Sequence, residues 1–126
     1  IVSGALRSDY QKTRLERMCE DLGIKSFTPL WHQSSKSHMD NLVANGFKVM
    51  ITGVSSEGLS EEWLGCVLDE SSLDKLKILA SEYRFHVDGE GGEYETLVVA
   101  GPHMKGELNL DFDIHWDGVR GHLEFI

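Results

Sequence analysis

The sequence has few of the residues that would indicate a disulfide-bonded, metal-binding or nucleic-acid-binding protein. Its 126 residues include two cysteines, two prolines, and 12 Lys and Arg against 21 Asp and Glu. Cys19 and Cys66 lack metal-ligand spacing, so we expect two reduced thiols. The net charge of −9 disfavours nucleic acid as a partner, because binding to a phosphate backbone depends on Lys and Arg.

Membrane-spanning and secretory segments are also missing from the sequence. No apolar stretch resembles a membrane span or a signal peptide, which favours a cytoplasmic protein without a membrane partner. The six histidines show no spacing that would bring two of them to one face of one element, so we expect no metal site. With 40% hydrophobic residues, the chain can build one modest core.

Hydrophobic periodicity predicts alternating strands and helices. A short apolar run at 1–6 precedes a helix that Ser8 caps and Gly23 ends, which is the βα unit of a parallel sheet. Residues 47–54 are apolar at nearly every position, as in a strand covered on both faces. The further predicted elements are a helix at 34–45, a helical turn at 60–63, a helix at 72–83, a strand at 94–100, an alternating strand at 107–116, and a hairpin with a two-residue turn at Asp117-Gly118, followed by a strand with Val119 facing inward.

The segment from His86 to Thr96 combines glycines with carboxylates. Its glycines allow positive φ and a close approach of the backbone to a ligand, and we expect positive φ at Gly91 or Gly92. Its acids repel one another unless a cation or a hydrogen-bond donor lies between them; they are Asp88, Glu90, Glu93 and Glu95. The alternative is an acidic turn whose charges face water.

Residues 89–96, Gly-Glu-Gly-Gly-Glu-Tyr-Glu-Thr, resemble the signature of the diphthine–ammonia ligase family, whose members are ATP pyrophosphatases of the PP-loop type. Other blocks resemble the family in the family's order: Ser8-Asp9-Tyr10-Gln11-Lys12-Thr13-Arg14 with Glu16, Pro29-Leu30-Trp31, Asn45-Gly46-Phe47, Glu57-Gly58-Leu59 and Trp63-Leu64-Gly65. The resemblance covers essentially the whole chain. It departs from the family at Gln33, where an arginine is usual, and in lacking the ATP-binding Ser-Gly-Gly-x-Asp-Ser loop.

The resemblance implies an α/β fold with two parts. Residues 1–25 would be the last βα unit of a Rossmann-like PP-loop nucleotide-binding domain. Residues 26–126 would be an α+β C-terminal substrate-binding domain with a mixed sheet that ends in a β-hairpin. The ATP-binding loop would lie in an N-terminal half outside this chain.

The resemblance also implies an activity, the amidation of diphthine on translation elongation factor 2 to diphthamide. ATP would adenylate the carboxylate with loss of pyrophosphate, and ammonia would attack the acyl-adenylate. ATP and Mg²⁺ would be held mainly by the missing half, with a cofactor-binding contribution from Gly4, Ser8, Asp9, Tyr10 and Arg14. Catalytic roles would fall to Glu90, Glu93 and Glu95, and substrate contacts to Gly91, Gly92, Tyr94, Thr96, Trp31 and Gly58. Diphthine carries a trimethylammonium, which carboxylates and aromatic faces bind together.

Several alternatives stay open at this point. The chain could belong to a PP-loop enzyme that acts on another carboxylate, or it could be a non-catalytic binding module. Asp9 and Arg14 could pair only with neighbours on their own helix. The sequence does not decide between a monomer and a homo-oligomer. Strand alternation predicts that Glu93 and Glu95 converge on one face, with Tyr94 on the other.

Overall fold

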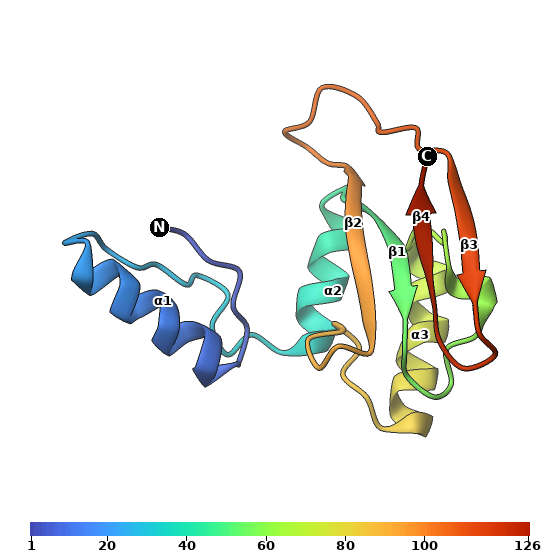
Figure 1. Ribbon diagram of the computed structural model, residues 1–126, viewed down its shortest axis with the longest axis horizontal. Helices are drawn as coiled ribbons and strands as arrows, with labels where there is room; N and C mark the ends of the chain where they lie inside the picture. The colour runs from blue at the N-terminus through green and yellow to red at the C-terminus, as the bar shows by residue number, and fades with distance from the viewer. The chain divides into compact units, whose positions relative to one another are not determined.

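Helix α1 (Asp9–Asp21) begins where the sequence predicts, because the Ser8 hydroxyl accepts a hydrogen bond from the backbone N–H of Gln11 at 3.3 Å. The helix ends before Gly23, whose φ is +65°. In the computed structural model, which describes residues 1–126, the segments on either side of α1 meet in a parallel bridge between Val2 and Phe27. The predicted helix lies within residues 1–34, one of two compact units of the chain (Figure 1), but the expected strand at 1–6 is reduced to this single bridge. The functional division at residue 25 stays a prediction.

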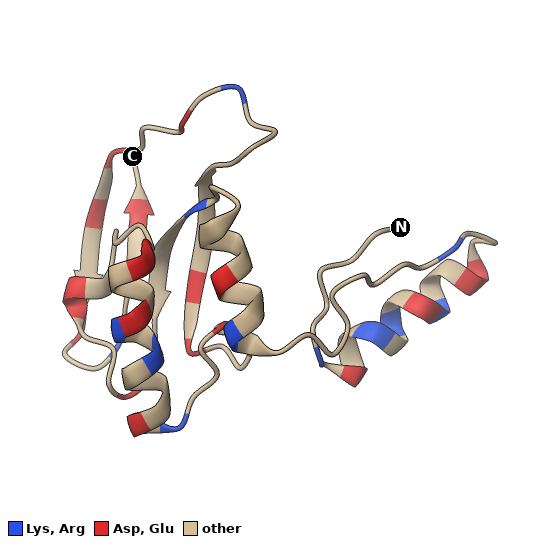
Figure 2. Cartoon of the chain, turned by 180° about the vertical axis from the view of Figure 1, so that it is seen from behind, with Lys and Arg blue, Asp and Glu red and all other residues tan.

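The second compact unit, residues 35–126, contains a four-stranded sheet. Its strands lie in the spatial order β2-β1-β4-β3 and are β1 (Lys48–Val54), β2 (Tyr94–Ala100), β3 (Phe112–Trp116) and β4 (Gly121–Phe125). Helices α2 (Ser35–Ala44) and α3 (Glu70–Tyr83) cover one face of the sheet and leave the other open (Figure 1, Figure 2). A 3-10 turn, η1 (Glu61–Trp63), lies between β1 and α3. The predicted α/β class with an α+β C-terminal part is confirmed.

Strand β1 is central because it pairs along both of its edges. Strand β2 follows one edge from Lys48 to Val54. The second edge is shared, since β4 pairs only with Gly53 and Val54. The segment 65–68 covers the rest of that edge through backbone hydrogen bonds of 2.8 to 2.9 Å to Val49 and Ile51. Ile51 is 0% exposed and lies at the centre of the core.

The expectation of a mixed sheet is wrong, because every pairing between its strands is antiparallel. The apolar run at 47–54 predicts a strand covered on both faces, whereas helices cover only one face of the sheet. Its burial has two other sources in this structure. Core residues of α2 and α3 pack against it, and the 65–68 segment pairs with its second edge.

The C-terminal hairpin also differs from its prediction. Strand β3 starts at Phe112, five residues after the predicted start, and Trp116 pairs with Gly121, so the turn spans 117–120. Asp117 explains the longer turn, because its Oδ1 accepts hydrogen bonds from the backbone N–H groups of Val119 (2.9 Å) and Arg120 (2.8 Å). These bonds hold the pKa of Asp117 below its ordinary value. Val119 is 68% exposed and does not face inward.

Both thiols are free, with Cys19 buried and Cys66 partly buried. Burial raises the pKa of Cys66, so it stays a neutral thiol at physiological pH. None of the helices has the length and apolar character that crossing a membrane requires.

Helix α3 starts two residues before its predicted beginning because Asp69 caps it. The Asp69 carboxylate accepts from the backbone N–H of Ser72 at 2.7 Å, and the Ser72 hydroxyl accepts from the backbone N–H of Asp69 at 2.8 Å. The hydrogen bonds that the carboxylate accepts from the backbone N–H and the hydroxyl of Ser72 hold the pKa of Asp69 below its ordinary value of 3.8. The cap therefore stabilises the fold fully above that value, and the stabilisation is lost as the pH falls through the lower pKa of the folded state.

We expect Asp69→Ala to lower the melting temperature by several degrees at pH 7, because the backbone N–H and the hydroxyl of Ser72 at the start of α3 both lose their carboxylate acceptor. The difference from the unmodified chain should shrink below pH 4. Thermal unfolding followed by circular dichroism measures both. Asp74→Ala, an exposed position within the same helix, is the control. An equal loss of stability in both variants would contradict the role of the cap.

Candidate functional site

One row of residues crosses the open face of the sheet. Gly53 on β1 pairs with Glu95 on β2 and with His122 on β4, and His122 pairs with His115 on β3. Residues directly opposite each other in antiparallel strands point to the same face. Gly53 has no side chain, so this row has a carboxylate on one side, two imidazoles on the other and a gap between them.

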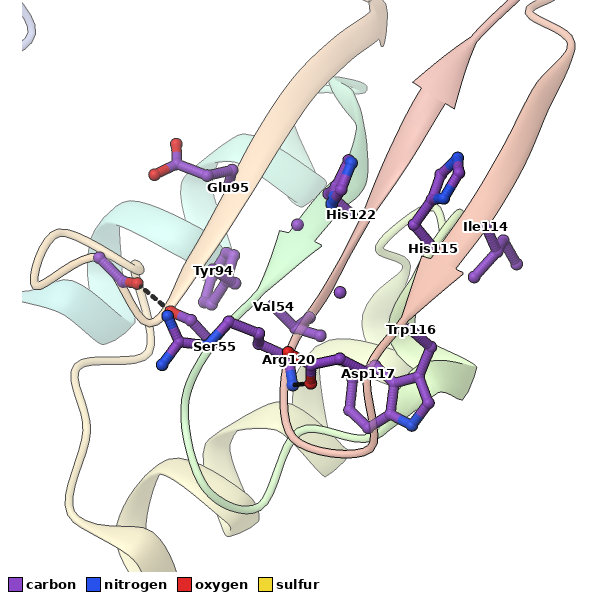
Figure 3. Close-up of a pocket in the computed structure, with 13 residues that line it drawn as sticks. Val54, Ser55, Tyr94, Glu95, Ile114, His115, Trp116, Asp117, Arg120 and His122 are labelled. Carbon is purple, nitrogen blue, oxygen red and sulfur yellow. Dashed lines mark hydrogen bonds between the residues drawn. The ribbon is translucent and has the colours of Figure 1, made fainter.

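The gap is part of a shallow pocket of about 670 Å³ (Figure 3). Glu95, His115 and His122 line its upper part in that view, and Ser55 and Arg120 line its lower part. The β2, β1 and hairpin segments that form it are distant in sequence. The pocket therefore depends on correct pairing at both edges of β1.

The glycine-rich segment is fixed to the end of β1. The Ser55 hydroxyl donates a hydrogen bond to the carbonyl oxygen of Gly92 at 2.6 Å. The backbone N–H groups of Ser55 and Ser56 both donate to the carbonyl oxygen of Glu93, at 2.9 and 3.2 Å. Gly92 has a φ of +83°, which confirms the expectation of positive φ in the Gly91-Gly92 pair. The positive φ turns the chain into β2 beside the pocket.

Glu93 and Glu95 do not converge, contrary to the expectation from alternation. Strand β2 begins at Tyr94, so the alternation does not extend to Glu93. The Glu93 Oε1 accepts from the backbone N–H of His86 at 3.2 Å, and its Oε2 is buried without a hydrogen-bond partner. The Glu95 side chain is exposed, makes no hydrogen bond or ion pair, and lines the pocket. Glu95 is therefore the motif carboxylate that is open to a ligand here.

Tyr94 anchors the glycine-rich segment from within. Its ring is 4% exposed and its hydroxyl donates to the carbonyl oxygen of Val87. Burial raises the pKa of Tyr94 far above its ordinary value, and the charges of Asp88, Glu93 and Glu90 raise it further. The phenol therefore stays protonated and keeps its hydrogen bond. It touches the pocket wall without presenting an open aromatic face.

The hairpin supplies pocket residues that the sequence analysis missed. They are Ile114, His115, Trp116, Asp117, Arg120 and His122. The Nε2 of His115 lies 2.7 Å from a carboxylate oxygen of Glu124, and the His115 ring stacks on the His122 ring with centroids 5.2 Å apart. In the alternating pattern at 107–116, His115 falls on the polar face with Asp111 and Asp113. The strand order brings that face beside Glu95, and no local sequence pattern predicts the strand order.

Other predicted site residues lie outside this pocket. Gly58 has a φ of +92°, and a side chain there would overlap the Tyr83 ring, so the glycine is needed for packing on α3. Gly58 lines a second pocket of about 570 Å³ with Trp116 and Val119. Thr96 is exposed on β2 opposite Ile51. Gly91 and Glu90 are exposed within the glycine-rich segment.

The predicted cofactor residues lie in the first compact unit. The Arg14 guanidinium donates to the Tyr10 hydroxyl at 3.2 Å and lies 5.5 Å from the centroid of its ring. Ser8 caps α1, Asp9 and Tyr10 are exposed beside it, and Gly4 has no neighbour within 4 Å of where a Cβ would be. Trp31, half-buried, lies under the Lys12 ammonium at 5.4 Å. Their roles toward ATP and substrate stay predictions.

No group of three His, Cys, Asp or Glu side chains comes close enough together to hold a metal ion. The chain also contains no Ser-Gly-Gly-x-Asp-Ser loop. Its own residues therefore do not make a site that fits Mg²⁺ with a triphosphate. The chemistry of the pocket lies in its carboxylate, guanidinium and imidazoles.

We expect Gly92→Ala to destabilise the fold by about 1 to 2 kcal/mol, because an L-residue must adopt the left-handed conformation. Gly92→Asn should recover much of the loss, since asparagine tolerates this conformation and the site has free space around it. Urea unfolding of the two variants measures the difference. Equal destabilisation by alanine and asparagine would show that the loss has a cause other than backbone conformation.

Comparison with known proteins gives consistent matches. Residues 34–125 match the diphthamide synthase C-terminal domain. The chain is 38% identical over 110 residues to the diphthine–ammonia ligase of Schizosaccharomyces pombe, a match that covers 87% of this chain and 18% of that protein. It is 33% identical over 112 residues to that of Homo sapiens, covering 88% and 42%, and 34% identical over 125 residues to that of Saccharomyces cerevisiae, covering 85% and 18%.

The chain thus spans less than half the length of each of these relatives. The matched segment includes the glycine-rich loop, the pocket and the hairpin. The family resemblance of the sequence is confirmed, and the chain belongs to the diphthamide synthase C-terminal domain family.

Proposed function

We propose that this chain acts as the substrate-binding part of an ATP-dependent diphthine–ammonia ligase, an enzyme of diphthamide biosynthesis. The observation that carries the proposal is Glu95, a motif carboxylate that lines a pocket and makes no hydrogen bond or ion pair. The family match and the names of the relatives supply the reaction class. The partners are elongation factor 2 carrying diphthine, and ammonia.

In this proposal Glu95 binds the trimethylammonium group of diphthine. A quaternary ammonium has no N–H to donate, so it is bound by charge and by aromatic faces. The pocket offers both, since the stacked His115 and His122 rings line the wall across Gly53 from Glu95. The gap at Gly53 leaves room for a bulky cation.

Glu93 and Glu90 have different proposed roles. The buried Glu93 Oε2 is an acceptor without a donor, so it can still accept a hydrogen bond from a ligand. We assign it the orientation of the attacking ammonia, whose N–H groups would satisfy it. Glu90 is exposed in the turn that leads to the pocket, where its charge adds to the attraction of a cationic substrate.

ATP supplies the activation of the carboxylate by adenylation. We assign the binding of ATP and Mg²⁺ mainly to protein outside this chain, because no phosphate-binding loop and no three-ligand cluster is present in it. Gly4, Ser8, Asp9, Tyr10 and Arg14 would contribute from the first unit. The residues of the second unit bind and orient the substrate.

Glu95→Gln in the protein expressed from its complete reading frame should lower kcat/KM for diphthine amidation roughly five- to thirtyfold. This change corresponds to a loss of about 1 to 2 kcal/mol of transition-state stabilisation. The effect is moderate because the pocket is open to solvent. The melting temperature should not change, since the Glu95 side chain makes no hydrogen bond or ion pair in the folded chain. Glu82→Gln on the exposed face of α3 is the matched control. Normal amidation by the Glu95 variant, or a fall in its melting temperature, would refute the assignment.

The 126-residue chain alone should bind ATP with Mg²⁺ more weakly than about 1 mM, because it lacks the backbone cradle that holds phosphates. Isothermal titration calorimetry tests this, with the adenosine nucleoside as the control for contacts that do not involve phosphate. A micromolar dissociation constant for ATP would place the nucleotide site within this chain.

A further inference from the structure

Two opposite charges line the pocket without pairing with each other. Glu95 on β2 makes no ion pair, and the Arg120 guanidinium makes neither a hydrogen bond nor an ion pair. In Figure 3 the Arg120 side chain extends from the hairpin turn toward Ser55, while the Glu95 carboxylate lies farther along β2. The Glu95 end of the pocket is therefore negative. The other end carries the Arg120 guanidinium near the Asp117 carboxylate, whose pKa is lowered by its backbone hydrogen bonds and further by the charge of Arg120.

The backbones that carry these two charges are held in place independently. Glu95 is fixed by its pairing with Gly53. Arg120 is fixed by the hairpin turn, where its N–H donates to Asp117 Oδ1 at 2.8 Å and its carbonyl accepts from the Asp117 N–H at 3.0 Å. The Asp117 carboxylate is already engaged with two backbone donors. Arg120 is therefore left with its full set of guanidinium donors for a ligand.

The space between the two ends is set by Gly53. A Cβ there would lie 3.5 Å from Glu95 Cβ and 3.7 Å from the Gly121 carbonyl oxygen, at ordinary contact distances. The packing of the sheet thus does not require a glycine here. Its main effect is that no side chain from position 53 fills the space of the pocket between Glu95 and the hairpin. Other titratable groups at the pocket are Asp117, His115 and His122, and His115 is paired with Glu124.

We infer that Arg120 is a specificity-determining residue that binds the carboxylate of a zwitterionic substrate, while Glu95 binds its cationic group. A guanidinium presents parallel N–H donors that match the two oxygens of a carboxylate, which a single ammonium cannot do. The inference rests on the proposed function for the role of Glu95. The site therefore selects substrates that carry a positive and a negative charge. It disfavours simple cations, because an unoccupied Arg120 repels a positive charge.

The test uses two small probes that differ in one charge. Glycine betaine carries a trimethylammonium and a carboxylate, and choline carries the trimethylammonium alone. Binding of each to the 126-residue chain is followed by amide chemical shifts at Gly53, Glu95 and Gly121. The variants are Arg120→Gln, Arg120→Lys and Glu95→Gln, with Arg84→Gln as a control of the same charge change, since Arg84 ends α3 and does not line the pocket.

Arg120→Gln should weaken betaine binding by about three- to fivefold and leave choline binding unchanged or strengthened, because a repelling charge is removed. Arg120→Lys should retain part of the betaine affinity. Glu95→Gln should weaken both probes, and Arg84→Gln neither. An equal effect of Arg120→Gln on betaine and choline, or no betaine binding to the unmodified chain at tens of millimolar, would overturn the inference.

The responses of the two probes to the four variants also distinguish this inference from the proposed function. If Glu95→Gln weakens choline while Arg120→Gln leaves the betaine-to-choline ratio unchanged, the role of Arg120 fails and the cation site at Glu95 remains. If neither probe responds to Glu95→Gln, both assignments fail.

Discussion

The pairing of β1 along both of its edges is the constraint on which the rest of the second unit depends. One edge holds β2 and with it the glycine-rich segment, whose Gly92 and Glu93 carbonyls accept from the residues that follow β1. The other edge holds the hairpin and the 65–68 segment. Ile51 lies at the centre with no exposed surface. A defect in β1 would therefore disrupt the core and both walls of the pocket together.

The carboxylates of the motif have different environments although they lie within a few residues of one another. Glu93 is turned inward to the His86 amide, Asp88 accepts from the Glu90 amide, and Glu95 is open. Crowded like charges are destabilising, so distributing them between internal hydrogen bonds and solvent reduces their repulsion. The same arrangement distinguishes Glu95, since it is the carboxylate of the motif that shares the pocket with Arg120.

Much of the fold could be predicted from local sequence. The start of α1 at Ser8 follows from cap chemistry, the end of α2 before Gly46 from a glycine stop, and β2 from its apolar pattern. Strand order could not be predicted, because pairing between β1 and β4 depends on contacts that no local pattern encodes. The turn at 117–120 was mispredicted because Asp117 caps two backbone donors, which extends the turn beyond Gly118.

The candidate site could likewise be predicted only in part, because local patterns do not encode contacts between distant segments. The glycine-rich segment could be found from its composition, and positive φ at Gly92 follows from its chemistry. The inward turn of Glu93 depends on where β2 begins, and the contribution of Arg120 depends on the register of a hairpin that is distant in sequence. Glu95 and Arg120 are brought together only by tertiary structure.

The narrow connection between β1 and β4 has a consequence for how the two walls of the pocket are held. Only Gly53 and Val54 join the hairpin to the central strand, whereas β2 is joined along its whole length. The hairpin is held mainly by packing instead, because Leu123 is buried in the core and Phe112 and Trp116 pack against it. One wall of the pocket therefore depends on backbone hydrogen bonds, and the other depends on the shapes of the side chains beneath it.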